Sequence, residues 1–173
     1  TTFTCYSGHY YARNQFMACM CRPGTKNNLN RGIYKSCNTY FSNVYRRIID
    51  KDNKVEENIN NWHKHLNSFG LGNYLGYDHP VGQPGYVPNA NFYNLWYPNQ
   101  RWRGSTIVSN AIGQGEILMT PIQLANVAAT IANRGFFYTP HFVKDIQGDF
   151  IDPKYKTKRA TSISKEHFTN VIE

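Results

Sequence analysis

The stretch GIYKSCNTYFSNVYRRIID, residues 32–50, places a polar triplet immediately before an amphipathic pattern. Ser36 and Asn38 belong to the triplet, and both are residue types that cap helices. The apolar residues that follow recur at the spacing of one helical face, at Phe41, Val44, Tyr45, Ile48 and Ile49. The pattern predicts a helix that begins near Ser36. Capping is the structural interpretation of the triplet, so a chemical role needs support from the rest of the chain.

Outward from this stretch, periodicity and turn residues divide the chain into five segments. Residues 1–20 hold two β-prone runs, 2–7 and 14–19, which predict a hairpin. The other four segments are a helical segment that includes the Ser-x-Asn triplet (28–70), an aromatic loop (71–106), a capped helix followed by a strand (107–146), and a C-terminal linker (147–173). We therefore expect one domain that is mainly α with a small β-hairpin.

Two further helices have clear ends. Residues 54–69 carry an amphipathic pattern that Gly70 stops. In TPIQLANVAATIANRG, residues 120–135, Thr120 is the expected N-cap, Pro121 takes the first helical position and Gln123 completes a capping box. Its predicted apolar face is Leu124, Val127, Ala128 and Ile131.

The charge balance argues against a nucleic-acid partner. The net charge is +8, from 19 Lys and Arg against 11 Asp and Glu, but the basic residues are diffuse. The one dense cluster, residues 154–159, reads as a solvated linker, and no nucleic-acid-binding motif accompanies the charge. No apolar run approaches the length of a membrane span. Both ends look cut from a longer chain.

Three of the four cysteines lie near the start, with His9 between them. Cys5, His9, Cys19 and Cys21 are residue types that bind zinc, but the C-x-C pair lacks the usual knuckle spacing. A disulfide between Cys5 and Cys19 across the hairpin fits better if the chain lies outside the cytoplasm, with Cys21 free or an alternative partner. Cys37 reads as a buried small residue rather than a nucleophile. We expect no metal.

Three stretches carry a family resemblance. GIYKSCNTYFSNV, FGLGNYLGYDHPVGQPGYVPN and STIVSNAIGQGEILMTPIQLANVAATIANRGFFYTPHFVKDI resemble the transpeptidase domain of class B penicillin-binding proteins, of the penicillin-binding protein 2 type. The resemblance runs in order through nearly the whole chain and weakens after residue 153. It implies the helical part of a β-lactamase/transpeptidase-like α/β domain.

The resemblance gives Ser36 and Asn38 a catalytic role. The family's cleft joins a Ser-x-x-Lys nucleophile motif, a Ser-x-Asn and a Lys-Thr-Gly strand, and the Ser-x-Asn corresponds to Ser36, Cys37 and Asn38. A hydroxyl there can relay a proton and an amide can hold the substrate backbone. The turn Gly113, Gln114 and Gly115 is a possible wall of the cleft or a purely structural turn.

The chain departs from the family pattern at both outer motifs. Ser162 and Lys165 spell a Ser-x-x-Lys, but they follow the Ser-x-Asn instead of preceding it, so we read them as a chance match. No Lys-Thr-Gly or Lys-Ser-Gly occurs, and Gly82 stands where the family loop often has Glu. The chain thus resembles the internal fragment between the two missing motifs.

By resemblance, the parent protein is a serine-type peptidoglycan D,D-transpeptidase that crosslinks stem peptides, is acylated by β-lactams and needs no cofactor. It would be anchored in the inner membrane by a helix outside this chain, face the periplasm and meet membrane proteins of the elongation machinery. The chain alone is expected to be inactive. The alternative is a non-catalytic cell-wall binding or scaffold module. His63 and His65 read as flanking or solvent-facing, and His141 as packed beneath the cleft.

Overall fold

The computed structural model describes residues 1–79, 81–99, 101–144, 147 and 151–172. The chain divides into two compact units. Unit 1 comprises residues 1–61 and 88–117, and unit 2 comprises residues 62–87 and 118–173. Within the described ranges, no helix has the length and apolar character needed to cross a bilayer.

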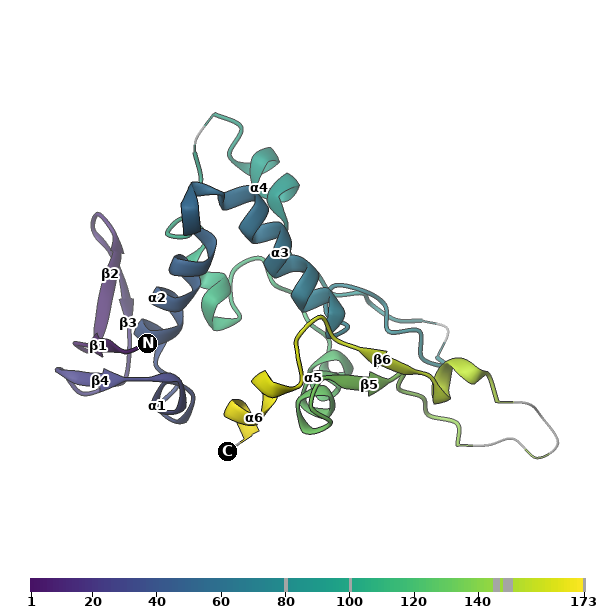
Figure 1. The fold of residues 1–173 in the computed structure, drawn as a ribbon. Helices are drawn as coiled ribbons and strands as arrows, with labels where there is room; N and C mark the ends of the chain where they lie inside the picture. The colour runs from purple at the N-terminus through teal and green to yellow at the C-terminus, as the bar shows by residue number, and fades with distance from the viewer. Residues whose placement is uncertain (80, 100, 145–146, 148–150, 173) are drawn as a thin grey trace. The chain divides into compact units, whose positions relative to one another are not determined.

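Helices predominate over strands in the described chain (Figure 1). The α-helices are α1 (Leu29–Tyr34), α2 (Asn38–Ile49), α3 (Val55–Ser68), α4 (Ala90–Trp96), α5 (Pro121–Ala132) and α6 (Glu166–Ile172). The 3₁₀ turns are η1 (Lys51–Asn53), η2 (Val108–Ile112) and η3 (Pro153–Lys156). The strands are β1 (Phe3–Cys5), β2 (Gly8–Ala12), β3 (Gln15–Ala18), β4 (Thr25–Asn27), β5 (Phe136–Tyr138) and β6 (Lys158–Ala160).

The first strands of unit 1 form two separate antiparallel ribbons, β1 with β4 and β2 with β3. In the first, Cys5 lies opposite Thr25, and in the second Gly8 lies opposite Ala18. A hairpin is present within residues 1–20, but the predicted pairing of runs 2–7 and 14–19 is wrong, because β3 pairs with β2, which lies in the predicted turn. The run 2–7 pairs with β4 instead, so a strand was missed at residues 25–27.

The helical hairpin of α1 and α2 is set by a glycine. Gly32 is buried in α1, and a Cβ atom built on it would lie 2.6 Å from the Tyr40 ring of α2. A side chain at this position would push the two helices apart, because real Cβ atoms do not approach that closely. Along α2, Tyr45 and Ile49 are buried as predicted, whereas Ile48 is half exposed.

The second predicted helix is confirmed as α3, and the boundary between the units falls within it. Ile59 is its buried residue. Gly70 follows with φ of +85°, in the left-handed region that commonly ends a helix. The loop expected at 71–106 contains α4, which Asn89 caps by accepting a hydrogen bond from the Phe92 backbone N–H.

In unit 2, α5 has the predicted capping box between Thr120 and Gln123. Its buried face was predicted wrongly. Gln123, Asn126 and Thr130 are buried, while Leu124 is 53 % exposed. The reason is hydrogen bonding, since the Gln123 and Asn126 amides donate to carbonyl groups that the turn and loop after α3 would otherwise leave unpaired.

The segment expected to be a linker, 147–173, carries structure in its described part. β6 pairs with β5, with Phe137 opposite Arg159. Phe168 of α6 is buried, and its ring lies 6.0 Å from that of Phe69. The predicted strand at the end of 107–146 is confirmed as β5, whereas residues 145–146 lie outside the described ranges.

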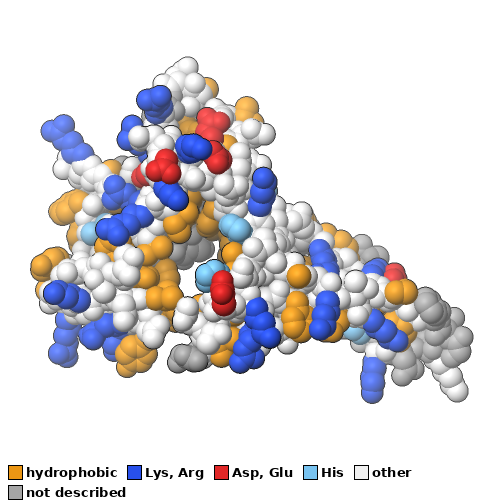
Figure 2. Space-filling model, viewed as in Figure 1, with side chains coloured by type: hydrophobic (Ala, Val, Ile, Leu, Met, Phe, Trp, Pro, Cys, Tyr) orange, Lys and Arg blue, Asp and Glu red, His pale blue; other side chains and the backbone are white. Residues whose placement is uncertain are grey.

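Side-chain views support the diffuse charge inferred from sequence. Figure 2 shows Lys and Arg side chains scattered over the visible face instead of gathered in one patch.

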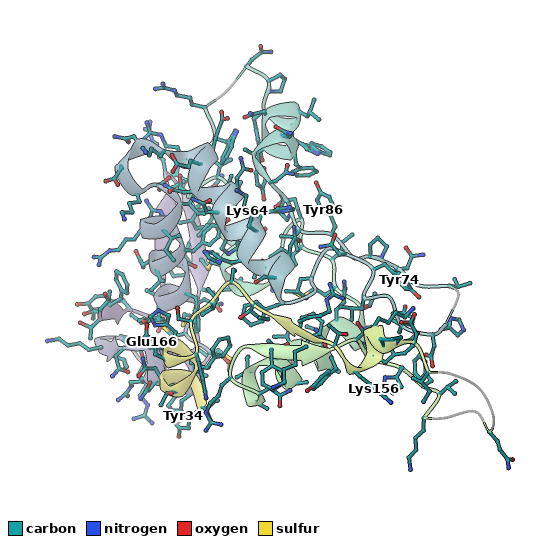
Figure 3. The ribbon with its side chains drawn as sticks, turned by 45° about the vertical axis from the view of Figure 1, so that its right-hand side comes forward. Tyr34, Lys64, Tyr74, Tyr86, Lys156 and Glu166 are labelled. Atoms are coloured by element: carbon teal, nitrogen blue, oxygen red, sulfur yellow. The ribbon has the colours of Figure 1, made fainter. Side chains whose placement is uncertain are left out.

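Two labelled tyrosines in Figure 3 hold the segment after α3. Tyr86 forms an isolated antiparallel bridge with Leu118. The Tyr74 hydroxyl lies within hydrogen-bond distance of the carbonyl oxygens of Tyr77 and His79.

Candidate functional site

The Ser-x-Asn triplet lies at the start of α2, where the sequence placed it. Cys37 is the N-cap residue and Asn38 is the first residue of the helix. Ser36 precedes them with φ of +47°, a left-handed conformation uncommon for residues other than glycine. Ser36 is exposed and Asn38 half-buried. The predicted position and accessibility are confirmed, but neither side chain is the cap.

Asn38 is fixed by the end of strand β3. Its Nδ2 donates to the carbonyl oxygen of Ala18 at 2.9 Å. One turn further along α2, the Ser42 hydroxyl lies 2.9 Å from the sulfur of Met17. These two contacts seat the start of the helix on the β2–β3 ribbon. Asn38 therefore has a defined orientation, and Ser36 stands beside it in solvent.

A cluster of four thiols, which we call the thiol cluster, lies directly behind this triplet. The Sγ atoms of Cys5, Cys19, Cys21 and Cys37 all lie within 4.8 Å of one another, and all four residues are buried. Cys19 Sγ is 3.6 Å from Cys21 Sγ and 3.7 Å from Cys37 Sγ. Cys5 Sγ lies 3.2 Å from the Thr39 hydroxyl.

No disulfide joins Cys5 and Cys19 in this structure, in which all four cysteines are free, and the predicted bond stays a prediction. Its premise was a hairpin that brings these two residues face to face. Since β1 pairs with β4, Cys5 lies opposite Thr25 instead. The cluster also includes Cys37, which the sequence assigned to a buried structural role. Cys37 is indeed fully buried, but it is buried against other sulfurs.

The donor set of the thiol cluster fits a zinc ion. Tetrahedral Zn²⁺ with Zn–S bonds of about 2.3 Å places its sulfur atoms about 3.8 Å apart. The two shortest sulfur distances, 3.6 and 3.7 Å, are close to that edge. The alternative ligand set considered from sequence included His9, which does not belong to the cluster. The expectation that the chain binds no metal stays a prediction. The distances between the sulfur atoms favour a metal site.

The thiols differ in acidity. Burial alone would raise the pKa of Cys19, but hydrogen bonds involving the backbone of Cys21 and Thr39 and the neighbouring thiols lower it to about 6. Burial raises the pKa of Cys21 and of Cys37. Of these three thiols, Cys19 therefore loses its proton most readily. Metal binding would deprotonate the rest.

The turn at Gly113, Gln114 and Gly115 belongs to the same unit as the triplet. Gly113 and Gly115 have φ of +69° and +76°, in the left-handed region that favours glycine. Asn110, just before the turn, donates to the hydroxyl groups of Tyr93 at 2.6 Å and Tyr45 at 3.2 Å. Tyr45 belongs to α2, so the turn is tied to the helix that carries Asn38. A role as cleft wall stays a prediction.

The polar network around Asn110 was missed from sequence. Tyr93 donates from its hydroxyl to Glu116 at 3.0 Å. Burial is the main cause of the raised pKa of both tyrosines, Tyr45 and Tyr93. They therefore stay neutral and act as hydrogen-bonding groups. No sequence motif marks such a network, because its members come from distant segments.

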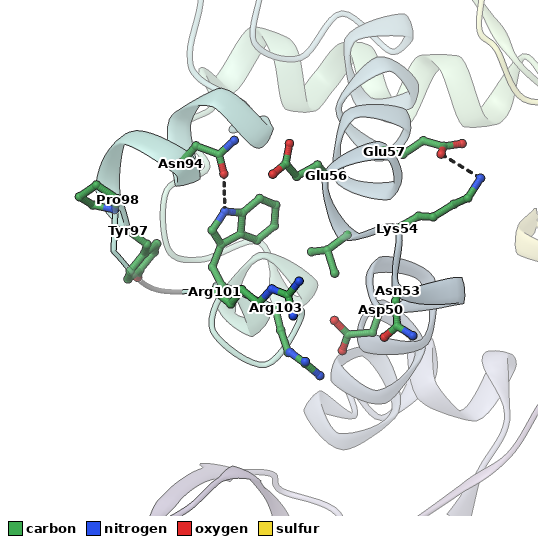
Figure 4. Close-up of a pocket in the computed structure, with 12 residues that line it drawn as sticks. Asp50, Asn53, Lys54, Glu56, Glu57, Asn94, Tyr97, Pro98, Arg101 and Arg103 are labelled. Carbon is green, nitrogen blue, oxygen red and sulfur yellow. Dashed lines mark hydrogen bonds and ion pairs between the residues drawn. The ribbon is translucent and has the colours of Figure 1, made fainter.

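Unit 1 also contains a cavity of about 880 Å³ (Figure 4). Its lining combines three acidic and three basic side chains, and Trp102 Nε1 donates to Asn94 Oδ1 at 2.8 Å. The lining acids are Asp50, Glu56 and Glu57, and the bases are Lys54, Arg101 and Arg103. The balance of signs gives no preference for an anion or a cation.

Ser162 of the chance Ser-x-x-Lys has a local structural role. Its hydroxyl lies 2.6 Å from His65 Nδ1 and 2.9 Å from the Ser68 hydroxyl, which ties the segment after β6 to the end of α3. His63 bonds the Val87 carbonyl through Nδ1 at 2.9 Å. His141 is exposed and its ring centroid lies 4.8 Å from that of Tyr155, so the prediction that it is packed beneath a cleft was wrong.

Comparisons with known proteins agree on one family. The family model for the penicillin-binding protein transpeptidase domain matches residues 1–173. The chain is 31 % identical over 121 residues to the peptidoglycan D,D-transpeptidase MrdA of Acinetobacter baumannii, covering 70 % of this chain and 16 % of that protein. For MrdA of Haemophilus influenzae the identity is 32 % over 126 residues, covering 72 % of this chain and 18 % of that protein.

Solved structures show the same similarity. Penicillin-binding protein 2 of Pseudomonas aeruginosa matches with a TM-score of 0.78 at 22 % identity, covering 99 % of this chain and 36 % of that one, which shows the fold. Penicillin-binding protein 2 of Helicobacter pylori matches with a TM-score of 0.74 at 27 % identity, covering 99 % of this chain and 29 % of that one. The chain thus spans about a third or less of the proteins it matches.

Proposed function

Because the chain belongs to the penicillin-binding protein transpeptidase domain family, we propose that it is the internal segment of a peptidoglycan D,D-transpeptidase. In this proposal it is the helical part of an α/β transpeptidase domain and carries the Ser-x-Asn element of the active site. The observation that supports this most is the helix start, where Ser36 is exposed and Asn38 is held by Ala18.

The proposed roles follow from the chemistry of these side chains. Ser36 relays a proton between the nucleophile's lysine and the leaving amine, which is general acid–base work for a positioned hydroxyl. The Asn38 amide uses one N–H for Ala18 and offers its carbonyl oxygen and second N–H to the substrate backbone. The nucleophilic serine and its lysine come from a segment outside this chain. The isolated chain is therefore inactive toward stem peptides and β-lactams.

The proposal extends to location and partners through the relatives. The parent enzyme acts on peptidoglycan stem peptides at the periplasmic face of the inner membrane. Penicillin-binding protein 2 of Helicobacter pylori has been solved in complex with MreC, with a TM-score of 0.70 to this chain at 27 % identity, covering 99 % of this chain and 29 % of that one. By analogy, the parent of this chain meets a component of the elongation machinery.

The test is acylation by a fluorescent penicillin, followed by intact mass analysis. The isolated chain should give no stoichiometric adduct. In the complete protein that carries this segment, Ser36→Ala and Asn38→Ala should each lower the acylation rate by about 10²-fold or more. Ser162→Ala is the matched control, because Ser162 is exposed and bonded to His65. An adduct on Ser36 or Ser162 of the isolated chain, or equal rates for all three variants, would contradict the proposal and favour a scaffold module.

A further inference from the structure

The cavity of unit 1, which we call the charged cavity, has two walls that come from different segments (Figure 4). One wall is the end of α2, η1 and the start of α3, and it carries Asp50 and Glu56. The other wall is the end of α4 and the segment after it, and it carries Arg101 and Arg103. Charges of opposite sign therefore line the two sides of the same cavity.

Several of these charges have no partner of opposite sign. Among the residues that the structure describes, the one ion pair that includes a lining residue joins Lys54 to Glu57 at 3.2 Å. That pair leaves Glu56, Arg101 and Arg103 without an ion-pair partner. All three residues are exposed, so their charges are hydrated and open to a ligand.

Hydrogen bonds fix the frame of the charged cavity. Trp102 is 7 % exposed, and its Nε1 donates to Asn94 Oδ1 at 2.8 Å. Asp50 Oδ1 accepts from the Gly104 backbone N–H at 2.8 Å, which joins the two walls. A cavity built in this way is formed before a ligand arrives, so binding does not have to order it.

The lining determines which class of ligand the charged cavity fits. A purely anionic ligand would face Asp50 and Glu56, and a purely cationic one would face the two arginines. An uncharged ligand would displace water from charged groups without replacing its interactions. A ligand that carries both charges offers each wall its opposite. The volume of about 880 Å³ suits a drug-sized ligand such as a short peptide.

We propose that the charged cavity binds a short zwitterionic peptide, whose carboxylate lies against Arg101 and Arg103 and whose ammonium group lies against Glu56. A guanidinium group binds a carboxylate through two parallel hydrogen bonds, which gives this end of the peptide its orientation. The ammonium group donates to the Glu56 carboxylate. The inference concerns binding alone, and no bond of the peptide is made or broken.

The identity of the peptide rests on the proposed function. Crosslinking joins an amine of one stem peptide to a carbonyl of another, and an uncrosslinked stem peptide ends in a carboxylate, so stem peptides carry both charges. Asn38 is the first residue of α2 and Asp50 is its C-cap, which separates them by about 18 Å along the helix axis. The charged cavity therefore holds a stem peptide that is not reacting, at the opposite end of α2 from the Ser-x-Asn triplet.

Isothermal titration calorimetry of the whole chain at low ionic strength tests the ligand class. The probe is L-alanyl-γ-D-glutamyl-L-lysine, and its two analogues have either the amines acetylated or the carboxylates amidated. The probe should bind at a single site, and each analogue should bind at least about tenfold more weakly, because it loses charge-assisted hydrogen bonds to one wall. Equal affinities for the three peptides, or no binding of the probe, would overturn the proposal.

Two variants test which wall binds which charge. Glu56→Gln should weaken binding of the probe about tenfold and leave binding of the acetylated analogue unchanged, since that analogue has no ammonium group. Arg103→Gln should weaken binding of the probe by a similar factor and leave binding of the amidated analogue unchanged. The matched controls are Asp52→Asn and Arg13→Gln, at exposed residues of the same unit that do not line the cavity, and they should leave the affinity unchanged.

Controls that weakened binding as much as Glu56→Gln and Arg103→Gln do would show that only net charge matters, and would overturn the proposal. Penicillin acylation is not measured in either experiment, and none of the variants changes the Ser-x-Asn triplet. A failure of peptide binding therefore refutes the charged cavity as a peptide site and leaves the test of the transpeptidase assignment unaffected.

Discussion

Gln123 allows the clearest test of how unit 2 is held together. Its side chain is 1 % exposed, and Nε2 lies within hydrogen-bond distance of the carbonyl oxygens of Pro84 (2.8 Å), Asn73 (2.9 Å) and Gly70 (3.2 Å). Its Oε1 accepts from the Thr120 backbone N–H at 2.9 Å. We propose the substitution Gln123→Met, which keeps the length of the side chain and removes every one of these bonds.

The expected loss follows from the count of hydrogens. Nε2 has two N–H groups, so its three contacts amount to two hydrogen bonds shared among three acceptors. Oε1 accepts two more, from the Thr120 backbone N–H and from the Thr120 hydroxyl at 3.2 Å. Gln123→Met thus removes four hydrogen bonds, each worth about 1 kcal/mol net. The free energy of unfolding should fall by about 4 kcal/mol, which is on the order of a thousandfold in the unfolding equilibrium constant. The carbonyl groups left buried can only add to this loss.

The assay is urea unfolding followed by far-ultraviolet circular dichroism. Gln114→Met is the matched control, because Gln114 is exposed in the Gly113–Gly115 turn, and its unfolding free energy should change by less than about 0.5 kcal/mol. If Gln123→Met lowered the free energy of unfolding no more than the control does, the Gln123 amide would not be what joins α5 to the loop. The apolar stripe that contains Leu124 would then have to be reconsidered as the buried face.

Two further outcomes concern the thiol cluster. The reduced chain should bind one equivalent of Zn²⁺ or Co²⁺, and the cobalt form should show thiolate-to-cobalt absorption. At a free zinc concentration 100 times Kd, the free energy of unfolding should rise by about 2.7 kcal/mol. Cys37→Ser should weaken metal binding, and an unchanged affinity in that variant would refute the tetrathiolate geometry. Because the pKa of Cys19 is lowered to about 6, its alkylation by iodoacetamide should be slow in the thiol form below that pH and rise as pH increases through it. Cys37, whose pKa burial raises, should stay unreacted at neutral pH, and mass spectrometry of the alkylated peptides distinguishes the two.

Helices with strong local signals could be predicted from the sequence. The Thr120 capping box, the stop at Gly70 and the periodicity after Ser36 depend on residues a few positions apart, and all three agree with the structure. Strand pairing was predicted less well, because the partner of β1 is β4, beyond an intervening ribbon. Periodicity gives strands but not their partners.

The buried face of α5 and the thiol cluster were both missed, because each depends on contacts between segments that are distant in the sequence. A periodic apolar stripe normally marks the buried face, yet at Gln123 and Asn126 side-chain hydrogen bonds to a distant loop decide the orientation. Likewise, Cys37 was separated from the other cysteines because nothing in its spacing shows that α2 starts behind β3. Both errors come from contacts between segments far apart in the chain.

The thiol cluster differs from the Gln123 network in how far along the chain its members are spread. All four sulfurs lie between residues 5 and 37, so the cluster can assemble as soon as residue 37 has left the ribosome. The Gln123 bond to Gly70 must wait for 53 more residues after Gly70. Short loops close at a lower entropy cost and generally sooner. The segment that carries Ser36 and Asn38 is thus positioned early in synthesis, before the helix α5 exists.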